Sequence, residues 1–347
     1  MGKALYEYGM ENSACVQILS MHDEQAKADG NCYFPSELFD GYAGNKSGFV
    51  INTVKKANRA DIIILSHINL LMVGWLIKKV NPAVKIILLA HGIEIWSKLH
   101  LFKKNMLSVC DRILAVSRFT ADKIMDIHHF AAEKISILNN CIDPFLPMPA
   151  VHFSAQKLKE KYGIKTDQTV LLTLTRLSAK DRYKGYDAVL EALLLLKNNN
   201  RKIKYILAGG YSASEKIFID TLIKKYGLEE NVVLTGYIPE SELTAHFCMA
   251  DIYVMPSTKE GFGIVFIEAM YYGLPVVAGN QDGSADALLN GELGLLIQPN
   301  NAAAITKAVE EMMVNKEFYK PNHHLLMSNF GYDTYKRKLE NFLSYDI

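Results

Sequence analysis

Two glutamates, Glu260 and Glu268, stand with seven residues between them and carry side chains that can bind a sugar. An ionised carboxylate accepts hydrogen bonds at both oxygens, so one glutamate can bind two neighbouring hydroxyls of a ribose or a hexose. The alternative is that Glu260 is a solvated loop residue and Glu268 a surface residue of a helix. The glycines and apolar residues around the pair favour sugar binding.

The residues around the two glutamates predict a strand, a tight turn and a helix in succession. Ile252–Met255 is a short apolar run, typical of a buried strand. Gly261 and Gly263 permit a tight turn, and a helical pattern begins at Ile264 and ends at Gly273. A helix start carries unpaired N–H groups and the positive end of the helix dipole. We therefore expect an anion site here that suits a diphosphate.

Two basic residues follow another apolar run, Val170–Leu174. Arg176 comes directly after this run, and Lys184 precedes the helical pattern that begins at Tyr186. Cations fixed at the end of a strand can neutralise a diphosphate, and an arginine can bind it through two parallel hydrogen bonds. The alternative is that both are ordinary solvated surface charges.

These residues together resemble a known family. The stretch Glu260–Glu268 is similar to the E-x7-E element of retaining glycosyltransferases with the GT-B fold, and most closely to glycosyltransferase family 4. The segments Gly236–Leu243, Ala250–Ser257 and Glu268–Val277 match the family in order and spacing. The resemblance covers roughly residues 10 to 345 and is most specific in the second half of the chain.

The resemblance implies roles for individual residues. Arg176 and Lys184 would bind the donor diphosphate, Glu260 the hydroxyls of the transferred sugar, and Glu268 the ribose. His91, at the end of an apolar run, would face the donor sugar, although a packed structural histidine is the alternative. Eight further residues would bind the donor: Gly209, Gly210, Tyr237, Ile238, Gly261, Phe262, Gly263 and Ile264. For Gly209 and Gly210, a simple strand-to-helix turn remains the alternative.

The function that the resemblance implies is transfer of a hexose from a UDP- or GDP-sugar to a glycan or lipid-linked acceptor hydroxyl, with an α-linkage. Bacterial surface polysaccharide synthesis is the implied setting. A nucleotide-sugar epimerase, a phosphorylase on the same fold and a non-catalytic sugar-nucleotide-binding protein are the alternatives. The sequence has no D-x-D motif and no cluster of His and Cys, so no metal ligands, metal or other cofactor are expected.

Composition sets broader limits. The chain has 347 residues, enough for two domains, and a net charge of +1, which gives no reason to expect nucleic acid binding. Its five cysteines are scattered and predict reduced thiols, and the start lacks the apolar core of a signal peptide. We expect a cytoplasmic protein. Peripheral contact with the inner membrane face, through the lysines and apolar residues of 96–104, is an open alternative to an ordinary solvated helix.

The order of elements predicts an α/β protein of GT-B type, with two doubly wound Rossmann-like domains that face a central cleft. The predicted domains are residues 1–145, on the acceptor side, and 146–330, which binds the nucleotide sugar. The proline-rich segment Asp143–Pro149 would link them, and a helix within 331–347 would return to the first domain. Residues 23–48 are rich in Gly, Asn, Asp and Lys and are predicted to form a loop.

One expected element is missing from the first domain. Lys3–Met10 has the pattern of the first helix and Cys15–Leu19 that of the second strand, but no strand pattern precedes them. The first strand of a doubly wound sheet is central, so its neighbours would keep unpaired backbone groups. This order predicts either a natural start upstream of Met1 or a poorly active form.

Overall fold

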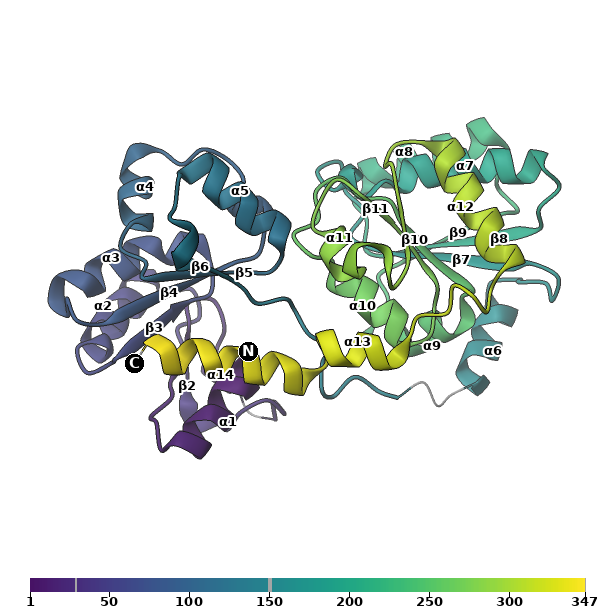
Figure 1. Ribbon diagram of the computed structural model, residues 1–347. Coiled ribbons are helices and arrows are strands. Elements are labelled where there is room, and N and C mark those ends of the chain that lie inside the picture. Colours follow the sequence, from purple (N-terminus) through teal and green to yellow (C-terminus); the bar gives the residue numbers. More distant parts are fainter. Residues whose placement is uncertain (29, 149–151, 347) are drawn as a thin grey trace. The chain divides into compact units, whose positions relative to one another are not determined.

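The chain folds into two compact α/β units in a computed structural model, which describes residues 1–28, 30–148 and 152–346 (Figure 1). The first unit comprises residues 1–116 and 121–138 together with the chain from Tyr335 onward. The second unit comprises residues 117–120 and 139–334. Each unit has its own hydrophobic core, so the chain contains two separately packed domains.

The first unit is built on a parallel sheet of four strands in the order β3-β4-β5-β6. These strands are β3 (Ile62–Leu65), β4 (Lys85–Ala90), β5 (Arg112–Ala115) and β6 (Ile135–Ile137). Their short apolar sequences are typical of strands buried on both faces of a parallel sheet. The apolar runs of the sequence predict strands here at Ile62–Leu65, Lys85–Leu89, Ile113–Val116 and Ile135–Leu138, and the structure confirms each of them to within one residue at either end.

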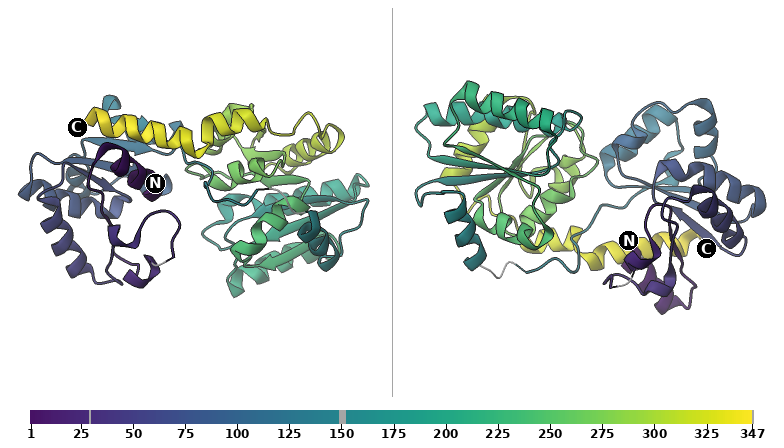
Figure 2. Two further views of the ribbon diagram at one scale, coloured as in Figure 1. Left: turned by 90° about the horizontal axis from the view of Figure 1, so that it is seen from below. Right: turned by 180° about the vertical axis from the view of Figure 1, so that it is seen from behind.

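Helices cover both faces of this sheet. In the views of Figure 2, α1 and α14 lie on one face and α2 and α3 on the other. The helices of this unit are α1 (Gly2–Asn12), α2 (Lys46–Ala57), α3 (Leu71–Val80), α4 (Leu101–Leu107), α5 (Arg118–His128) and α14 (Tyr332–Asp346). Short 3-10 turns lie at 25–28, 36–38, 68–70, 93–95 and 132–134.

A separate pair of parallel strands, β1 (Ile18–Ser20) and β2 (Phe39–Gly41), lies outside the four-stranded sheet. The expected loop over 23–48 was therefore wrong at β2, whose only buried residue is Phe39. Three residues with one apolar side chain give too weak a pattern, because the pairing with β1 is what makes them a strand. The strand expected at Cys15–Leu19 is confirmed at Ile18 and Leu19, but its predicted start was wrong, since β1 begins at Ile18.

The second unit contains a six-stranded parallel sheet in the order β12-β11-β10-β7-β8-β9. The first strand along the chain, β7, is therefore central, as in a doubly wound sheet. The six strands are β7 (Thr169–Leu174), β8 (Ile203–Ala208), β9 (Val232–Gly236), β10 (Ile252–Met255), β11 (Val276–Gly279) and β12 (Leu295–Ile297). The apolar runs of the sequence predict six strands here, and the structure confirms all of them to within two residues at either end: Val170–Leu174, Tyr205–Ala208, Val232–Thr235, Ile252–Met255, Val276–Ala278 and Leu295–Ile297.

The helices of the second unit form two layers. The core cluster joins α7, α8 and α12 to one face of the sheet, and Figure 1 shows α9 and α10 on the other face. Local signals set several ends: Ser212 accepts a hydrogen bond from the Glu215 amide to cap α8, which ends at the left-handed Gly227. The helices are α6 (His152–Lys161), α7 (Tyr186–Asn198), α8 (Ala213–Tyr226), α9 (Glu240–Met249), α10 (Ile264–Tyr271), α11 (Ser284–Ala287), α12 (Ala302–Val314) and α13 (His323–Phe330).

The linker and the last helix that the sequence predicts can both be compared with the structure. The expected linker Asp143–Pro149 has no regular structure through Met148, and Pro149 lies outside the described residues. The expected last helix is α14, whose Tyr335 hydroxyl lies 3.6 Å from the Met1 sulfur and whose Lys336 pairs with Glu11 of α1. None of the described helices combines the length and apolar composition that a membrane crossing requires.

Candidate functional site

The loops that carry most of the predicted site residues meet at one edge of the second sheet. In a parallel sheet all strands end at the same edge, so the segments after β7, β8, β10 and β11 are brought together there. Arg176 follows β7, Gly209 follows β8, and Glu260 follows β10. This edge is the usual ligand-binding edge of open α/β sheets.

Lys184 and Glu260 form an ion pair at this edge, between the Lys184 Nζ and Glu260 Oε1 atoms. Lys184 ends a short helical turn after β7, whereas Glu260 lies in the loop after β10. Both side chains are largely shielded, with 15% and 11% of their surface exposed. Burial raises the pKa of Glu260, and the ammonium group of Lys184 works against that rise. The ion pair therefore connects two loops, each of which the sequence separately predicts to bind the donor.

The loop that carries Glu260 is held in place by the buried carboxylate of Asp282. One oxygen of Asp282 accepts hydrogen bonds from the Glu260 amide at 2.6 Å and the Ser257 hydroxyl at 2.8 Å. Its other oxygen accepts the Ser284 amide at 2.9 Å. In return, the Gly283 amide donates to the Glu260 carbonyl at 2.8 Å. These bonds tie the loop after β11 to the loop after β10 and fix the backbone of Glu260.

Two glycines allow these loops to approach closely. A Cβ atom on Gly209 would lie 1.6 Å from the Thr175 carbonyl oxygen, and the φ angle of Gly209 is +139°. A Cβ atom on Gly283 would lie 2.1 Å from the Gly261 carbonyl oxygen. Contacts this short are impossible for any other residue, so both glycines have a packing reason that does not depend on a ligand. For Gly209, the strand-to-helix turn alone explains the residue type.

The start of α10 presents unpaired backbone donors beside the ion pair. Gly263 adopts a left-handed conformation at the N-cap, with φ of 83°, and its carbonyl accepts the Phe266 amide. Within the described chain, the amides of Gly261, Phe262 and Ile264 have no hydrogen-bond acceptor. Free amides at the positive end of a helix form the kind of site that binds phosphate groups.

Glu268 lies one turn further along α10 and is half-buried. Burial raises the pKa of its carboxyl group, and the charge of Asp143 adds to the rise. No side chain in the described part of the molecule donates a hydrogen bond to this carboxylate. Both Glu260 and Glu268 lie close enough to the buried Tyr253 to raise the pKa of its hydroxyl, after the larger effect of burial. The charges of both glutamates therefore act on the same buried tyrosine.

Arg176 is the most exposed of the predicted donor residues, with 82% of its side chain accessible. Its guanidinium group lies 3.6 Å from Asp181, which also accepts a hydrogen bond from the Ser178 hydroxyl. Tyr183 precedes Lys184 in the chain, and its ring centre lies 5.3 Å from the Lys184 ammonium nitrogen. Burial and the charge of Glu260 raise the pKa of Tyr183 to about 12. Most of the arginine side chain is therefore accessible to an anion from solvent.

Tyr237 and Ile238 follow β9 at the rim of the same edge. Tyr237 is 80% exposed and Ile238 is buried. The Gly236 carbonyl accepts the Gly209 amide at 2.9 Å, which brings this loop beside Gly209 and Gly210. A Cβ atom on Gly210 would meet only the Cβ of Tyr237, at 4.0 Å. An exposed tyrosine beside an open glycine gives this rim room for a flat group such as a base.

His91 belongs to the first unit, where it follows β4. Its Nε2 atom lies 2.8 Å from the Ser66 carbonyl oxygen, so the ring is held by the end of the neighbouring strand. Glu94 accepts the His91 amide at 2.6 Å and the Gly92 amide at 3.2 Å. The carboxylate of Glu94 therefore caps its own turn. His91 itself is exposed.

Two residues that organise the edge were not predicted as part of the site. Asp282 and Tyr183 were passed over because each contacts residues far away in the sequence, and a single carboxylate or tyrosine has no local pattern. The Gln281–Gly283 turn after an apolar strand was the one available signal for Asp282. Among the described residues, no group of three or more His, Cys, Asp and Glu side chains is arranged to hold a metal ion.

Two family models match the chain. The family described as "Glycosyl transferases group 1" matches residues 154–325, and "Glycosyltransferase Family 4" matches residues 28–145. A similar protein is the GDP-mannose-dependent alpha-(1-6)-phosphatidylinositol monomannoside mannosyltransferase of Mycolicibacterium smegmatis. It is 28% identical over 276 residues, which are 75% of this chain and 70% of that protein. The D-inositol 3-phosphate glycosyltransferase of Corynebacterium aurimucosum is 29% identical over 201 residues, 56% of this chain and 47% of that protein.

Solved structures share the fold over almost the whole chain. A glycosyltransferase from Rickettsia africae has a TM-score of 0.82 at 20% identity, covering 99% of this chain and 94% of that chain. The Anabaena protein Alr3699/HepE in complex with UDP has a TM-score of 0.80 at 18% identity, covering 99% and 96%. At these identities the likeness concerns the fold, which is two Rossmann-like units with parallel sheets.

Proposed function

Because this chain is a glycosyltransferase of the GT-B fold, similar to family 4, and so an enzyme that uses a nucleotide sugar, we propose a specific reaction for it. The enzyme transfers a hexose from a UDP- or GDP-sugar to a hydroxyl of a glycan or lipid-linked acceptor, with retention and an α-linkage. The GDP-mannose and phosphatidylinositol monomannoside in the name of the mycobacterial relative support this choice of donor and acceptor class. The UDP bound to the Anabaena protein supports UDP-sugars as the other donor class.

The observation that carries the proposal is the buried ion pair of Lys184 and Glu260 beside the free amides of α10. An ammonium group has three donors, so Lys184 can keep Glu260 and contact a phosphate oxygen at the same time. The amides of Gly261 and Phe262 would bind the same diphosphate. Glu260, oriented by Lys184 and by Asp282 below its backbone, would then accept hydrogen bonds from the hydroxyls of the sugar.

The other predicted donor residues have side chains or backbone that an incoming nucleotide sugar can reach. The accessible Arg176 would close on the diphosphate from the solvent side and bind it through two nitrogens. Glu268 keeps an unshared carboxylate, which suits the two hydroxyls of a ribose. Tyr237 and the open Gly210 would border the base.

The chemistry requires stabilisation of the negative charge that develops on the leaving diphosphate. Lys184 and the start of α10 would supply preorganised positive charge at that place, where the burial of Lys184 strengthens its interaction, and the exposed Arg176 would add a second cation from the solvent side. The proton of the acceptor hydroxyl would pass to the departing phosphate oxygen. These groups do the work that a metal ion does in other enzymes, so we propose that the reaction needs no metal or other cofactor. His91 would contact a hydroxyl of the donor sugar.

We place this reaction in bacterial surface polysaccharide synthesis, on the cytoplasmic side of the inner membrane. The lipid-linked acceptor in the name of the mycobacterial relative supports an acceptor at a membrane surface. Leu101 and Phe102 are 83% and 66% exposed, and Lys103 and Lys104 follow them, which supports peripheral contact.

A donor screen tests the proposal. Purified protein is incubated with individual UDP- and GDP-hexoses and an extract of glycan and lipid acceptors, and released UDP or GDP is measured. One donor should give nucleotide release that depends on the acceptor, and NMR of the product should show the same anomeric configuration as the donor. Conversion of the sugar without release of nucleotide would mean an epimerase. Binding without turnover for every donor would contradict an enzyme.

A further inference from the structure

The turn that follows β3 gathers three basic side chains of the first unit. The Nε2 atom of His91 lies 2.8 Å from the Ser66 carbonyl oxygen. The Asn69 amide donates to the Nδ1 atom of His67 at 3.1 Å, and the Asn69 side-chain oxygen accepts a hydrogen bond from the Lys103 ammonium at 3.2 Å. Because β3 and β4 are parallel, the residues that follow them lie at the same edge of the sheet.

Lys103 differs from other half-buried lysines of this unit in the partner that it contacts. Lys3 and Lys78 are also half-buried, and each forms an ion pair with a carboxylate, at 2.6 and 3.0 Å. Within the described residues, the only hydrogen-bond acceptor of the Lys103 ammonium is the neutral side chain of Asn69. Partial burial of a charge without an opposite charge costs free energy. An anion bound from solvent would remove that cost.

His67 is held as a hydrogen-bond donor beside this lysine. Because its Nδ1 atom accepts the Asn69 amide, the neutral ring carries its hydrogen on Nε2. No acceptor for that hydrogen lies in the part of the chain that the structure describes. An ammonium group has three hydrogens, and Lys103 uses one of them for Asn69. Both side chains therefore keep unused N–H donors next to Asn69.

The carboxylate of Glu94 belongs to the same edge and does not neutralise these donors. Its Oε1 atom accepts the amides of His91 and Gly92. Among the described residues, Glu94 forms no ion pair with Lys103 or His67. The turn after β3 therefore keeps an excess of positive charge.

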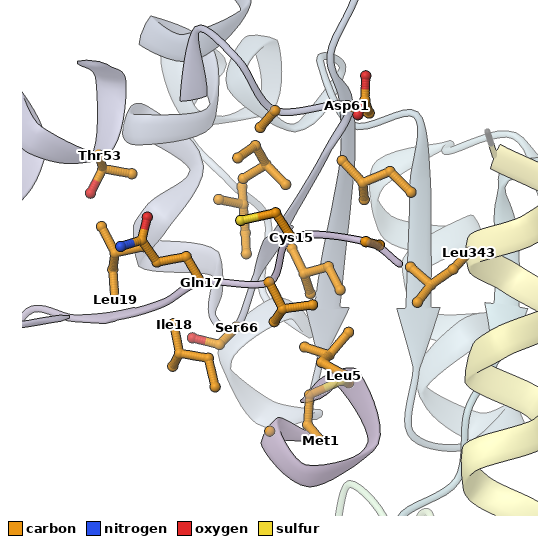
Figure 3. Close-up of a pocket in the computed structure, with 18 of the residues that line it drawn as sticks. Met1, Leu5, Cys15, Gln17, Ile18, Leu19, Thr53, Asp61, Ser66 and Leu343 are labelled. Atoms are coloured by element: carbon orange, nitrogen blue, oxygen red, sulfur yellow. The ribbon is translucent and has the colours of Figure 1, made fainter. Parts of the chain in front are cut away.

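A cavity of about 580 Å³ reaches the same turn, because Ser66 is part of its lining (Figure 3). Most of the other lining residues are apolar, such as Leu5, Ile18 and Leu343. His67 and Lys103 are not among the lining residues. The two basic side chains therefore lie outside this cavity, and an anion that they bind would stay at the edge of the sheet.

The chemistry of the unused donors fits a phosphate group. A phosphate ester has three strong acceptor oxygens, so it can bind the Lys103 ammonium and the His67 ring together. Lysine is a common phosphate ligand that acts as a point charge. A neutral sugar hydroxyl would leave the charge of Lys103 uncompensated.

We propose that Lys103 and His67 bind a phosphate group of the acceptor substrate. The inference rests on the proposed function, in which His91, held by the same turn, contacts the donor sugar. The exposed Leu101 and Phe102 directly precede Lys103, so a phosphate bound there would have apolar side chains near it for a lipid chain. The acceptor would be a phosphorylated lipid or a phosphorylated sugar, which share this group.

An NMR titration of protein labelled with ¹⁵N-histidine tests the site, with glycerol 3-phosphate at constant pH as the probe. The ring signals of His67, assigned by their absence from His67→Gln, should shift as the probe is added. The signals of His324, an exposed histidine of the second unit, should stay in place. Equal shifts of both histidines, or no shift of His67, would overturn the proposal.

A pair of lysine variants tests whether the site is defined. Lys103→Met removes the charge but keeps an apolar stem, and it should weaken binding of glycerol 3-phosphate by roughly tenfold or more, as for a lost hydrogen bond to a charged group. Lys104→Met removes the same charge from the next position, which is exposed, and should change the affinity by less than about twofold. Equal losses would mean general attraction by surface charge and would contradict the proposal. If Lys103→Met does not fold, the comparison of His67 with His324 in the wild type decides.

The titration does not depend on turnover, so it separates this site from the proposed function. Release of UDP or GDP without a shift of His67 would remove the phosphate site alone. A shift of His67 without nucleotide release from any donor would support the site and remove the transfer reaction.

Sedimentation with vesicles distinguishes the two sources of phosphate. Binding to phosphatidylcholine vesicles that requires added phosphatidic acid, and that falls in Lys103→Met, would support a lipid phosphate. A shift of His67 with glycerol 3-phosphate but equal sedimentation with both kinds of vesicle would support a soluble phosphorylated acceptor.

Discussion

The carboxylate of Asp282 receives two backbone amides and one hydroxyl, and all three donors lie in the loops that hold Glu260. A carboxylate that accepts this many hydrogen bonds acts as a fixed support for the turn. Burial is the larger influence and raises the pKa of Asp282, while these hydrogen bonds work against the rise. The position of Glu260 thus depends on a residue that itself has no predicted contact with the donor.

Replacing this support should affect turnover more than binding of the nucleotide. In Asp282→Asn, one of the two oxygens becomes an amide nitrogen that cannot accept, and the unpaired partner costs about 1–3 kcal/mol of stability. We expect a lower kcat on the true donor, a lower melting temperature and a nearly unchanged affinity for free UDP or GDP. Gln281→Ala, at the exposed neighbouring position, is the control. Unchanged kcat in a destabilised Asp282→Asn would limit the role of Asp282 to folding.

Arg176 gives the cleanest test of diphosphate binding, because it is mostly exposed and its removal should leave stability intact. Arg176→Ala should weaken binding of UDP or GDP by about 1.5–3 kcal/mol, the contribution of a hydrogen bond to a charged group. Calorimetry should show almost no change for uridine or guanosine. Lys180→Ala, an exposed cation in the same loop, serves as the control. An equal loss for nucleoside and diphosphate would contradict the assignment.

At this scale the sequence predicted the kinds of residues better than their contacts. The apolar runs before Arg176, Gly209 and Glu260 placed these residues at strand ends, and parallel strands end at one edge. The contact between Lys184 and Glu260 depends on which strands are neighbours. β7 and β10 are separated by 77 residues in the chain but are adjacent in the sheet, where Leu171 pairs with Ile252. This adjacency is visible only in the folded structure.

At the scale of elements, a buried cluster joins the turn before α7 to the start of α8. Arg182 contacts both oxygens of Glu215, at 2.9 and 3.0 Å, and the Tyr186 hydroxyl donates to the same carboxylate at 2.6 Å. Arg182 also lies 3.5 Å from the centre of the Phe218 ring. Burial alone would raise the pKa of Glu215, but the bonds from Arg182 and Tyr186 prevail and lower it from 4.5.

This lowered pKa predicts a pH dependence of stability. A carboxyl group with a lower pKa in the folded state stabilises the protein above its unfolded value, and that contribution is lost as the pH falls through the folded value. The wild type should therefore lose more unfolding free energy between pH 7 and about pH 3 than Glu215→Gln, which lacks the titrating group. Urea titrations at several pH values measure this difference. Glu229→Gln, at an exposed site, should follow the wild type, and parallel curves for all three proteins would refute the role of Glu215.

The elements that the sequence did not reveal are short or weakly patterned. The strand β2 has one buried residue, and α11 has four residues in all. Elements this short are stabilised mainly by contacts with residues that are distant in the sequence, and a local sequence pattern carries no information about those contacts. The strands of the second sheet, in contrast, are continuous apolar runs, and for this reason their positions were predicted within one or two residues.

At the scale of the whole molecule, the two units should respond to different changes. Leu339 of α14 is fully buried in the first unit, so Leu339→Ala should destabilise that unit by about 2–5 kcal/mol. UDP or GDP should raise the unfolding temperature of the second unit, to which the proposed donor residues belong. Differential scanning calorimetry with and without nucleotide separates the two transitions. Ser344→Ala, at an exposed position of the same helix, is the control, and a Leu339→Ala effect on the nucleotide-sensitive transition alone would contradict this division.

The return of α14 to the first unit has a consequence for how the protein is made. Tyr335 and Leu339 are buried there, and Lys336 forms ion pairs with Glu7 and Glu11. On the ribosome, the first unit therefore emerges early but lacks this helix until the second unit has been translated. At typical rates of synthesis this delay is roughly 10–40 s, during which the apolar surface that α14 covers stays open to chaperones. The second unit emerges as nearly one continuous segment and can fold first, although it is encoded later.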